Sequence, residues 1–287
     1  MRHLLTIGCS LGEGPSWDAT TSTWLFVDIT QALVHRLDPV SGELTSFTPG
    51  MECSAVVPTA CGRLLLVGFD RLLLCDASGA NIHDFGAPFE TDPLIRMNDA
   101  KVDSRGRLWA GSRDKERAGR ARLFRIDAEG TSTVMREGVN VSNGIGWSPD
   151  DATMYYIDSL TYSLRAFDFD PVAGELGASR ELCSFDPSTG LPDGLSVDEA
   201  GIIWVAHFGS GTITGHTPAG EQVGVHQLPV PNVTSLAFGG AEGTEVLVTT
   251  ARYRMAEAEI AGSPRSGDLF IDDWGVRGVP THPFIVG

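Results

Sequence analysis

Short runs of β-branched, aromatic and other apolar residues recur along the chain, each between clusters of Asp, Ser, Gly and Pro. No apolar pattern of helical period is sustained over three turns, and 34 glycines and 16 prolines are spread along the chain. This pattern predicts an all-β protein. The expected strands include Trp24–Asp28, Leu64–Phe69, Leu108–Gly111, Met154–Asp158, Ile202–Ala206 and Glu245–Thr250.

The spacing of these runs predicts the architecture. The anchor residues Trp24, Leu65, Trp109, Met154, Trp204 and Val246 follow one another at steps of 41, 44, 45, 50 and 42 residues. A period of about 40–50 residues with several strands per period is typical of a β-propeller. We therefore expect residues 1–287 to form one domain, a six-bladed β-propeller with four-stranded antiparallel blades. A two-sheet sandwich would not explain the six-fold period.

Two turn sequences also repeat. An Asp precedes a Trp by six residues in 18–24, 103–109 and 198–204, and we expect these tryptophans to pack between blades. The sequence Asp-Pro-Val-x-Gly-Glu-Leu occurs at 38–44 and again at 170–176, which is 132 residues or three periods of 44 later. Its Pro and Gly indicate a strand–turn–strand element.

The charge balance narrows the choice of partners. The chain has 37 acidic and 21 basic residues and a formal net charge of −16, which argues against binding to nucleic acid or to a membrane surface. No apolar run approaches the roughly 20 residues of a membrane helix, and no signal peptide is evident. The five cysteines contain no C-x-x-C pair and are expected to be mostly buried thiols of a cytoplasmic protein.

A ring of polar residues is expected near the propeller axis. Eleven residues before the successive anchors, the chain has Glu13, Ser54, Asn98, Asn143, Asp193 and Ser235. Equivalent positions in successive blades lie at one level, and oxygen-bearing side chains suit a hard divalent cation. Glycine follows three of them, so the backbone could turn sharply there; alternatively, Asn-Gly and Asp-Gly are simply turn residues.

Other motifs are weaker. Gly8–Gly12 matches G-x-S-x-G, but the Gly-Glu-Gly-Pro that follows blocks the helix that a serine hydrolase needs. His207 is either a structural histidine or a channel-lining one. Arg96 either binds an oxygen-rich substrate or pairs with a carboxylate such as Asp99. The charged loop 113–120 is either a solvated loop or a lid over the channel.

Several of these segments together resemble the SMP-30/gluconolactonase/regucalcin family of six-bladed propellers, over nearly the whole chain. The matching segments are Leu-Gly-Glu13-Gly-Pro-Ser-Trp, Arg96-Met-Asn98-Asp-Ala-Lys-Val-Asp-Ser-Arg-Gly-Arg-Leu-Trp-Ala-Gly, Ser-Asn143-Gly-Ile-Gly-Trp-Ser-Pro-Asp, Tyr-Tyr-Ile-Asp158-Ser, Pro-Asp193-Gly-Leu and Ser235-Leu-Ala-Phe-Gly-Gly.

The resemblance implies a site. Glu13, Asn143 and Asp193 would hold one divalent cation (Ca²⁺, Mg²⁺, Mn²⁺ or Zn²⁺), and Asp193 would also transfer the proton. Arg96 and Asn98 would contact the oxygens of the substrate, as would a Glu that falls at Glu116 when residues are counted without gaps. Met97 departs from the family pattern, in which an aromatic residue is common, and is expected to alter the pocket wall; Ala100 stands where Gly is common.

The implied activity is metal-dependent hydrolysis of a sugar lactone to the aldonic acid. An alternative enzyme is another ester or phosphotriester hydrolase that uses the same metal site. A third possibility is a non-catalytic calcium-binding regulatory protein, although two carboxylates and one amide would make a sparse calcium site. The sequence leaves the sugar, the physiological metal and the oligomeric state open.

Overall fold

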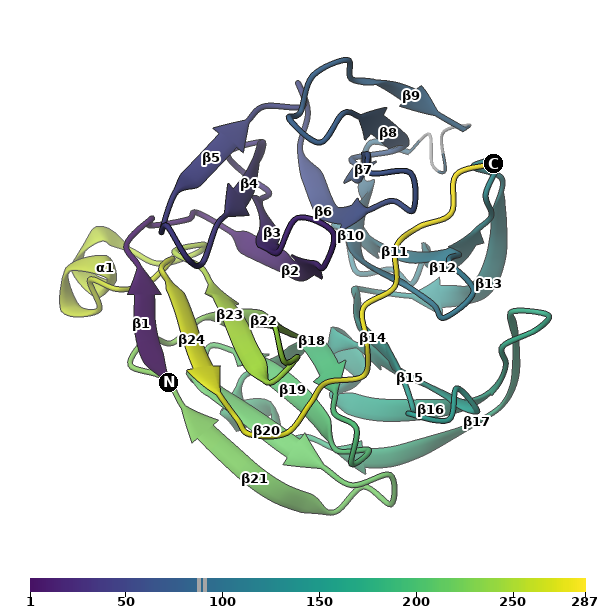
Figure 1. The fold of residues 1–287 in the computed structure, drawn as a ribbon. Helices are drawn as coiled ribbons and strands as arrows, with labels where there is room; N and C mark the ends of the chain where they lie inside the picture. Colours follow the sequence, from purple (N-terminus) through teal and green to yellow (C-terminus); the bar gives the residue numbers. More distant parts are fainter. Residues whose placement is uncertain (87–88, 90–91) are drawn as a thin grey trace.

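The strands form six four-stranded antiparallel sheets arranged around a common axis in the computed structural model, which describes residues 1–86, 89 and 92–287 (Figure 1). The predicted six-bladed β-propeller is therefore confirmed. We number the blades 1 to 6 by the position of their innermost strand along the chain. In blades 1 to 5 the innermost strand comes first, and the chain then steps outwards through neighbouring antiparallel strands.

The first three blades occupy the N-terminal half. Blade 1 comprises β2 (Gly12–Asp18), β3 (Thr23–Asp28), β4 (Leu33–Leu37) and β5 (Leu44–Phe47); blade 2 comprises β6 (Cys53–Pro58), β7 (Leu64–Gly68), β8 (Leu72–Cys75) and β9 (His83–Phe85); blade 3 comprises β10 (Ile95–Val102), β11 (Leu108–Asp114), β12 (Ala121–Ile126) and β13 (Ser132–Val139).

The last three blades follow the same plan. Blade 4 comprises β14 (Ser142–Trp147), β15 (Thr153–Asp158), β16 (Ser163–Asp170) and β17 (Glu175–Ser184); blade 5 comprises β18 (Leu191–Val197), β19 (Ile203–Phe208), β20 (Thr212–His216) and β21 (Gln222–Gln227); blade 6 comprises β22 (Val233–Gly239), β23 (Glu245–Thr250), β24 (Leu269–Asp273) and β1 (Arg2–Leu5).

The ring is closed by the two ends of the chain. The N-terminal strand β1 pairs antiparallel with β24, so that Arg2 lies opposite Ile271 and His3 opposite Phe270. Blade 6 thus takes three strands from the C-terminal part of the chain and its outermost strand from the N-terminus (Figure 1). This pairing joins residues more than 260 positions apart, and the local sequence of the four-residue strand β1 does not predict it.

Helices are short and peripheral. The part of the chain that the structure describes forms one α-helix, α1 (Glu257–Gly262), and the 3₁₀ turns η1 (Ser159–Thr161) and η2 (Pro187–Thr189). Among the helices of the described residues, none is long and apolar enough to cross a membrane.

All six predicted runs correspond to the second strand of a blade, and the repeated turns stabilise them. The Asp103 carboxylate accepts a hydrogen bond from the indole nitrogen of Trp109 over 2.9 Å. Asp198 and Trp204 form the same bond at the same distance in blade 5. The blade 1 copy differs because the Asp18 carboxylate bonds to Thr20, Thr21 and Arg36 instead.

The hydrophobic core is divided into six wedges, one between each pair of adjacent blades. Trp24 lies in the wedge between blades 6 and 1, and Trp109 lies between blades 3 and 4. Trp204 packs against the wedge between blades 5 and 6. The predicted packing of tryptophans between blades is confirmed, and burial of these wedges holds the blades face to face.

The C-terminal segment after β24 crosses one end of the propeller. Backbone bonds join Val279 to Val197 of blade 5, Phe284 to Pro58 of blade 2, and Gly287 to Ala128 of blade 3. Figure 1 shows this segment in yellow, running across the face of the blades. We call residues 278–287 the strap, and the end that it crosses the strap end of the axis.

Candidate functional site

Four of the six predicted ring residues line one cavity at the end of the axis opposite the strap. The cavity has a volume of about 140 Å³ and receives Glu13, Asn98, Asn143 and Asp193 from blades 1, 3, 4 and 5. Ser54 and Ser235 are buried and do not line it. The apolar part of its wall consists of Leu11, Val141, Leu160, Leu191 and Phe208.

A β-bulge positions the ring residue in every blade. The register between the first and second strands shifts at or beside the ring residue in all six blades. A bulge inserts an extra residue into one strand and redirects the side chains next to it. In a regular strand, alternate side chains of the innermost strand would point towards the neighbouring blades. The bulge interrupts this alternation and lets the polar side chain point elsewhere.

The glycines after the ring residues serve close packing more than tight turning. Of the three glycines that follow Glu13, Asn143 and Asp193, only Gly14 has a positive φ, of 53°. A Cβ at Gly144 would lie 2.8 Å from the Asp193 carbonyl oxygen, and one at Gly194 would collide with the side chain of Ser235. Neighbouring innermost strands therefore approach too closely for a larger residue, which draws the ring side chains together. The predicted sharp turn holds at Gly14 alone of these three.

The carboxylates in the cavity repel one another. Glu13 and Asp193 are only 8% and 7% exposed. Burial raises the pKa of Glu13 well above its ordinary value, and the negative charges of Asp193 and Asp99 raise it further. Burial and the charge of Asp99 likewise raise the pKa of Asp193. The charges of Arg96 and Arg113 oppose these shifts in part, but neither arginine forms an ion pair with Glu13 or Asp193, so the two buried carboxylates remain costly and this end of the axis favours a cation.

An amide network fixes the third predicted ligand. The Asn98 Nδ2 donates to the side-chain oxygen of Asn143 over 3.1 Å and to the Ser142 carbonyl over 2.8 Å. The Asn143 Nδ2 donates to the Ser159 hydroxyl over 2.8 Å, and that hydroxyl donates to the Pro192 carbonyl over 2.6 Å. Both side-chain groups of Asn143 are therefore oriented by neighbours, as is common around metal ligands.

The donor set fits a hard divalent cation. Glu13 and Asp193 supply carboxylate oxygens and Asn143 an amide oxygen, the ligands that Ca²⁺, Mg²⁺ and Mn²⁺ prefer. Among the described residues, no basic side chain lies within ion-pairing distance of Glu13 or Asp193. No group of three or more His, Cys, Asp or Glu side chains in that part of the chain could hold a metal ion, so the amide is needed.

Basic residues surround the mouth of this cavity. Arg113, Lys115, Arg117 and Arg254 line it, together with Tyr253 and Asp114. Partial burial raises the pKa of Tyr253, but the nearby charges of Arg113 and Arg254 outweigh this effect and leave the pKa below its ordinary value.

Arg96 lies behind this mouth and outside the cavity lining. It forms no ion pair with Asp99 or with any other acidic side chain among the described residues. Its Nη1 donates to the Met97 carbonyl over 3.0 Å. Asp99 instead lies near Lys101, and burial raises the pKa of Asp99 to about 6 although the charge of Lys101 opposes this. Pairing of Arg96 with Asp99 is thus not observed.

The loop after β11 has an ordered core. The Asp114 carboxylate accepts hydrogen bonds from the backbone nitrogens of Glu116, Ala118 and Arg120. The Arg120 guanidinium, which bonds to both Asp114 oxygens, holds the pKa of that carboxyl well below its usual range. The beginning of the loop borders the cavity, whereas Glu116 is exposed and pairs with Arg120 over 3.0 Å. Glu116 lies outside the cavity lining, and its contact with substrate stays a prediction.

Two other expectations are resolved by burial. His207 is 1% exposed and its Nε2 bonds to the Thr214 hydroxyl over 2.7 Å within blade 5. It is therefore a structural histidine. It lines neither this cavity nor a smaller one at the strap end of the axis. Met97 packs in the apolar wedge between blades 2 and 3, so the expectation that it alters the pocket wall is wrong.

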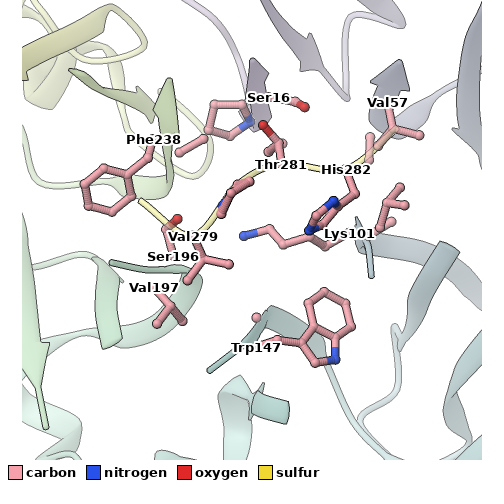
Figure 2. Close-up of a pocket in the computed structure, with 18 of the residues that line it drawn as sticks. Ser16, Val57, Lys101, Trp147, Ser196, Val197, Phe238, Val279, Thr281 and His282 are labelled. Atoms are coloured by element: carbon pink, nitrogen blue, oxygen red, sulfur yellow. The ribbon is translucent and has the colours of Figure 1, made fainter. Parts of the chain in front are cut away.

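A second, smaller cavity lies at the strap end. Its volume is about 60 Å³, and it is lined by the far halves of the innermost strands and by residues 279–282. Figure 2 shows the Lys101 side chain extending across it towards Ser196 and Val279. The Lys101 Nζ donates to the Leu195 carbonyl over 2.8 Å and so links blade 3 to blade 5. The strap and Lys101 together obstruct this end, so a ligand would reach Glu13 and Asp193 from the opposite end.

Sequence reasoning missed three contributors to the site. Ser159, which orients Asn143, directly follows Asp158 at the end of a strand run, and that position was its only signal. Tyr253 and Arg254 lie three and four residues beyond the last predicted strand. Nothing in their local sequence distinguishes them, because their place in the cavity depends on the closure of the ring.

Comparison with known proteins shows the family of this chain. Residues 11–252 match the model of a family described as the SMP-30/Gluconolactonase/LRE-like region. A Bacillus subtilis protein with the provisional name sugar lactone lactonase YvrE is 31% identical over 276 residues, which cover 96% of this chain and 94% of that protein. Bovine regucalcin is 32% identical over 289 residues, which cover 98% of this chain and 97% of regucalcin.

A solved structure shares the whole architecture. The crystal structure of regucalcin from Agrobacterium tumefaciens, described as a calcium-binding protein, matches with a TM-score of 0.93 and 25% sequence identity. The match covers 99% of this chain and 96% of that structure.

Proposed function

The chain belongs to the SMP-30/gluconolactonase/LRE-like family, and from this premise we propose that it is a divalent-metal-dependent lactonase that hydrolyses a sugar lactone to the aldonic acid. The relative from Bacillus subtilis that carries a sugar lactone lactonase name supports the reaction class.

One observation carries the proposal. The buried carboxylates of Glu13 and Asp193 line one cavity with the oriented amide of Asn143, and burial and nearby negative charges raise the pKa values of both acids. Among the described residues, no basic side chain forms an ion pair with either acid, and the set offers only oxygen ligands. We assign these three residues to the cation. When bound, the cation supplies Lewis-acid polarisation of the lactone carbonyl.

The chain's own residues then carry the proton transfer. We assign Asp193 as the general base, which takes a proton from the attacking water as the water oxygen bonds to the carbonyl carbon. The ring C–O bond breaks, and Asp193 returns the proton to the former ring oxygen, which becomes a hydroxyl. Because the pKa of Asp193 is raised, the carboxylate is better matched to a proton that it must both accept and return.

Substrate binding falls to the mouth of the cavity. Asn98 lines it and is held by blade 4 through its Nδ2, so we assign its side-chain oxygen to a sugar hydroxyl. Arg96, which is buried behind the mouth, is assigned to the substrate oxygens through its guanidinium. Glu116 would reach a substrate only if it left Arg120, so its assignment is the weakest of the set.

A calcium-binding role is the second candidate, because the regucalcin structure from Agrobacterium is described as that of a calcium-binding protein. An activity towards other esters or phosphotriesters would use the same cavity. We place the protein in the cytoplasm, because all five cysteines are free, as expected in a reducing compartment.

The test is hydrolysis of a panel of five- and six-membered aldonolactones, measured as acid release above the spontaneous rate. Chelator-treated protein should be inactive, and a single divalent metal should restore activity. Absence of activity with every lactone and metal, in folded protein that binds metal, would overturn the lactonase assignment. Calcium binding without hydrolysis would favour the second candidate.

A further inference from the structure

Two arginines lie directly opposite each other beside the mouth of the cavity. In the antiparallel pair β10–β11, Arg96 is the register partner of Arg113. Side chains directly opposite in such a pair lie close together on one face of the sheet, and like charges in this arrangement are destabilising. Among the described residues, neither arginine has a carboxylate within ion-pairing distance. The pair therefore carries two positive charges that no protein anion neutralises at close range.

The hydrogen bonding of the pair is also incomplete. Arg96 is buried and its Nη1 donates to the Met97 carbonyl. The Nε of Arg113 is buried and has no hydrogen-bond partner, although the Arg113 side chain hydrogen-bonds to the Tyr253 hydroxyl. Burial and the charge of Arg113 lower the pKa of Arg96 to about 10, whereas Glu52 and Glu13 act on it only from a distance. A buried donor without a partner is costly, which indicates that a ligand completes this group.

Further basic side chains lie around the arginine pair. Lys115, Arg117 and Arg254 also line the cavity and have no ion-pair partner among the described residues. Of the acids in the lining, Asp114 is occupied by Arg120, and Glu13 and Asp193 are assigned to the cation. A basic mouth is unexpected in a chain of net charge −16, and such a mouth attracts anions.

We propose that the substrate is a sugar lactone that bears a carboxylate or phosphate group, and that Arg113, opposite Arg96 at the mouth of the cavity, binds this anionic group. The proposal rests on the lactonase function and specifies its substrate class. A guanidinium presents a planar fork of donors that binds either anion through two parallel hydrogen bonds. The anion would neutralise the arginine pair and provide an acceptor for Arg113.

The first test compares three substrates: a hexarolactone with a free carboxylate, a 6-phosphorylated hexonolactone and the matching neutral hexonolactone. The protein should prefer one of the two anionic lactones, and the better one identifies the group. Arg113→Gln should raise KM for that lactone by roughly 10- to 100-fold, and by about tenfold or more beyond any rise in KM for the neutral lactone. Rising salt should weaken binding of the anionic lactone only.

Arg105→Gln is the matched control. Arg105 is exposed in the turn between β10 and β11, at the other end of the same hairpin, and its substitution removes the same charge. If Arg113→Gln does not fold, Arg113→Lys keeps the charge but loses the fork and should still raise KM for the anionic lactone. A neutral lactone preferred over both anionic ones, or an equal rise in KM for all three, would overturn the proposal.

A binding measurement separates this proposal from the lactonase function. The open-chain aldarate dianion should bind the wild-type protein more tightly than neutral alditol does, and Arg113→Gln should abolish the difference in calorimetric titrations. Aldarate binding that depends on Arg113, without hydrolysis of any lactone, would reject the lactonase function and keep the anion site. Hydrolysis of neutral lactones with no Arg113-dependent aldarate binding would do the reverse.

Discussion

The side-chain nitrogen of Asn98 donates a hydrogen bond to the side-chain oxygen of Asn143 over 3.1 Å, and so joins blade 3 to blade 4 at the cavity. The family resemblance gives these residues separate tasks, Asn98 with the substrate and Asn143 with the cation. If both residues have these roles, the bond between them would couple substrate binding to cation binding.

Replacement of Asn98 by Ala should therefore affect both ligands. We expect KM for the lactone to rise, and the metal concentration needed for half-maximal activity to rise by roughly tenfold, because Asn143 loses an orienting partner. Activity titrated with metal at several lactone concentrations measures both effects. An unchanged metal requirement would show that the bond does not orient Asn143.

Ser159→Ala should weaken metal binding more than it weakens substrate binding. The Ser159 hydroxyl connects Asn143 to the Pro192 carbonyl, and its loss leaves a buried amide group of Asn143 without a partner. We expect roughly 10- to 100-fold weaker metal binding by calorimetry. Ser148→Ala is the control, since Ser148 is a buried serine at the other end of blade 4. Equal metal affinity in both variants would contradict the assigned role.

Asp193→Asn should separate catalysis from stability. Turnover should fall by orders of magnitude because the general base is lost. In chelator, however, the variant should melt at a higher temperature than wild type at pH 7, because a buried carboxyl whose charged form is disfavoured by burial and by Asp99 is replaced by a neutral amide. Asp168→Asn, on the outer part of blade 4, is the charge-matched control. Full activity in Asp193→Asn would remove Asp193 from the proton transfer.

The strap is expected to contribute stability rather than chemistry. Phe284 is fully buried in the wedge between blades 2 and 3, with its ring edge-on to Phe85 at 5.9 Å. Phe284→Ala should lower the free energy of unfolding by about 3–5 kcal/mol. Denaturant titration measures this, with the half-exposed Ile285→Ala as control. The folded variant should keep its activity at low temperature, and a selective loss of activity would assign the strap a role at the site.

His207 should make the fold sensitive to acid. Burial, with a smaller effect of His216, lowers the pKa of His207 to about 4. The folded state thus favours the neutral ring, so its contribution is complete above about pH 6.5 and is lost as pH falls from about 6.5 to 4. The loss at pH 4 is on the order of 3 kcal/mol. His207→Gln should flatten the fall in melting temperature over this window, and parallel curves for the two proteins would refute the assignment.

The local sequence patterns are enough to predict the propeller. Each blade has its own strand run and turn, such as Asp103 with Trp109. These local patterns repeat because every blade packs against its two neighbours in the same way. Counting from these anchors also led to the ring residues, four of which meet in one cavity. Periodicity can reveal these features because equivalent positions occupy equivalent places in every blade.

The closure of the ring and the surroundings of the site depend on contacts between distant segments, which the sequence pattern does not reveal. The pairing of β1 with β24 and the path of the strap join distant segments through backbone hydrogen bonds, which any sequence can form. The β-bulges, the opposition of Arg96 and Arg113, and the bond from Asn143 to Ser159 depend on strand register. A one-residue shift would turn each of these side chains to the other face, and that register is fixed only when the blades pack together.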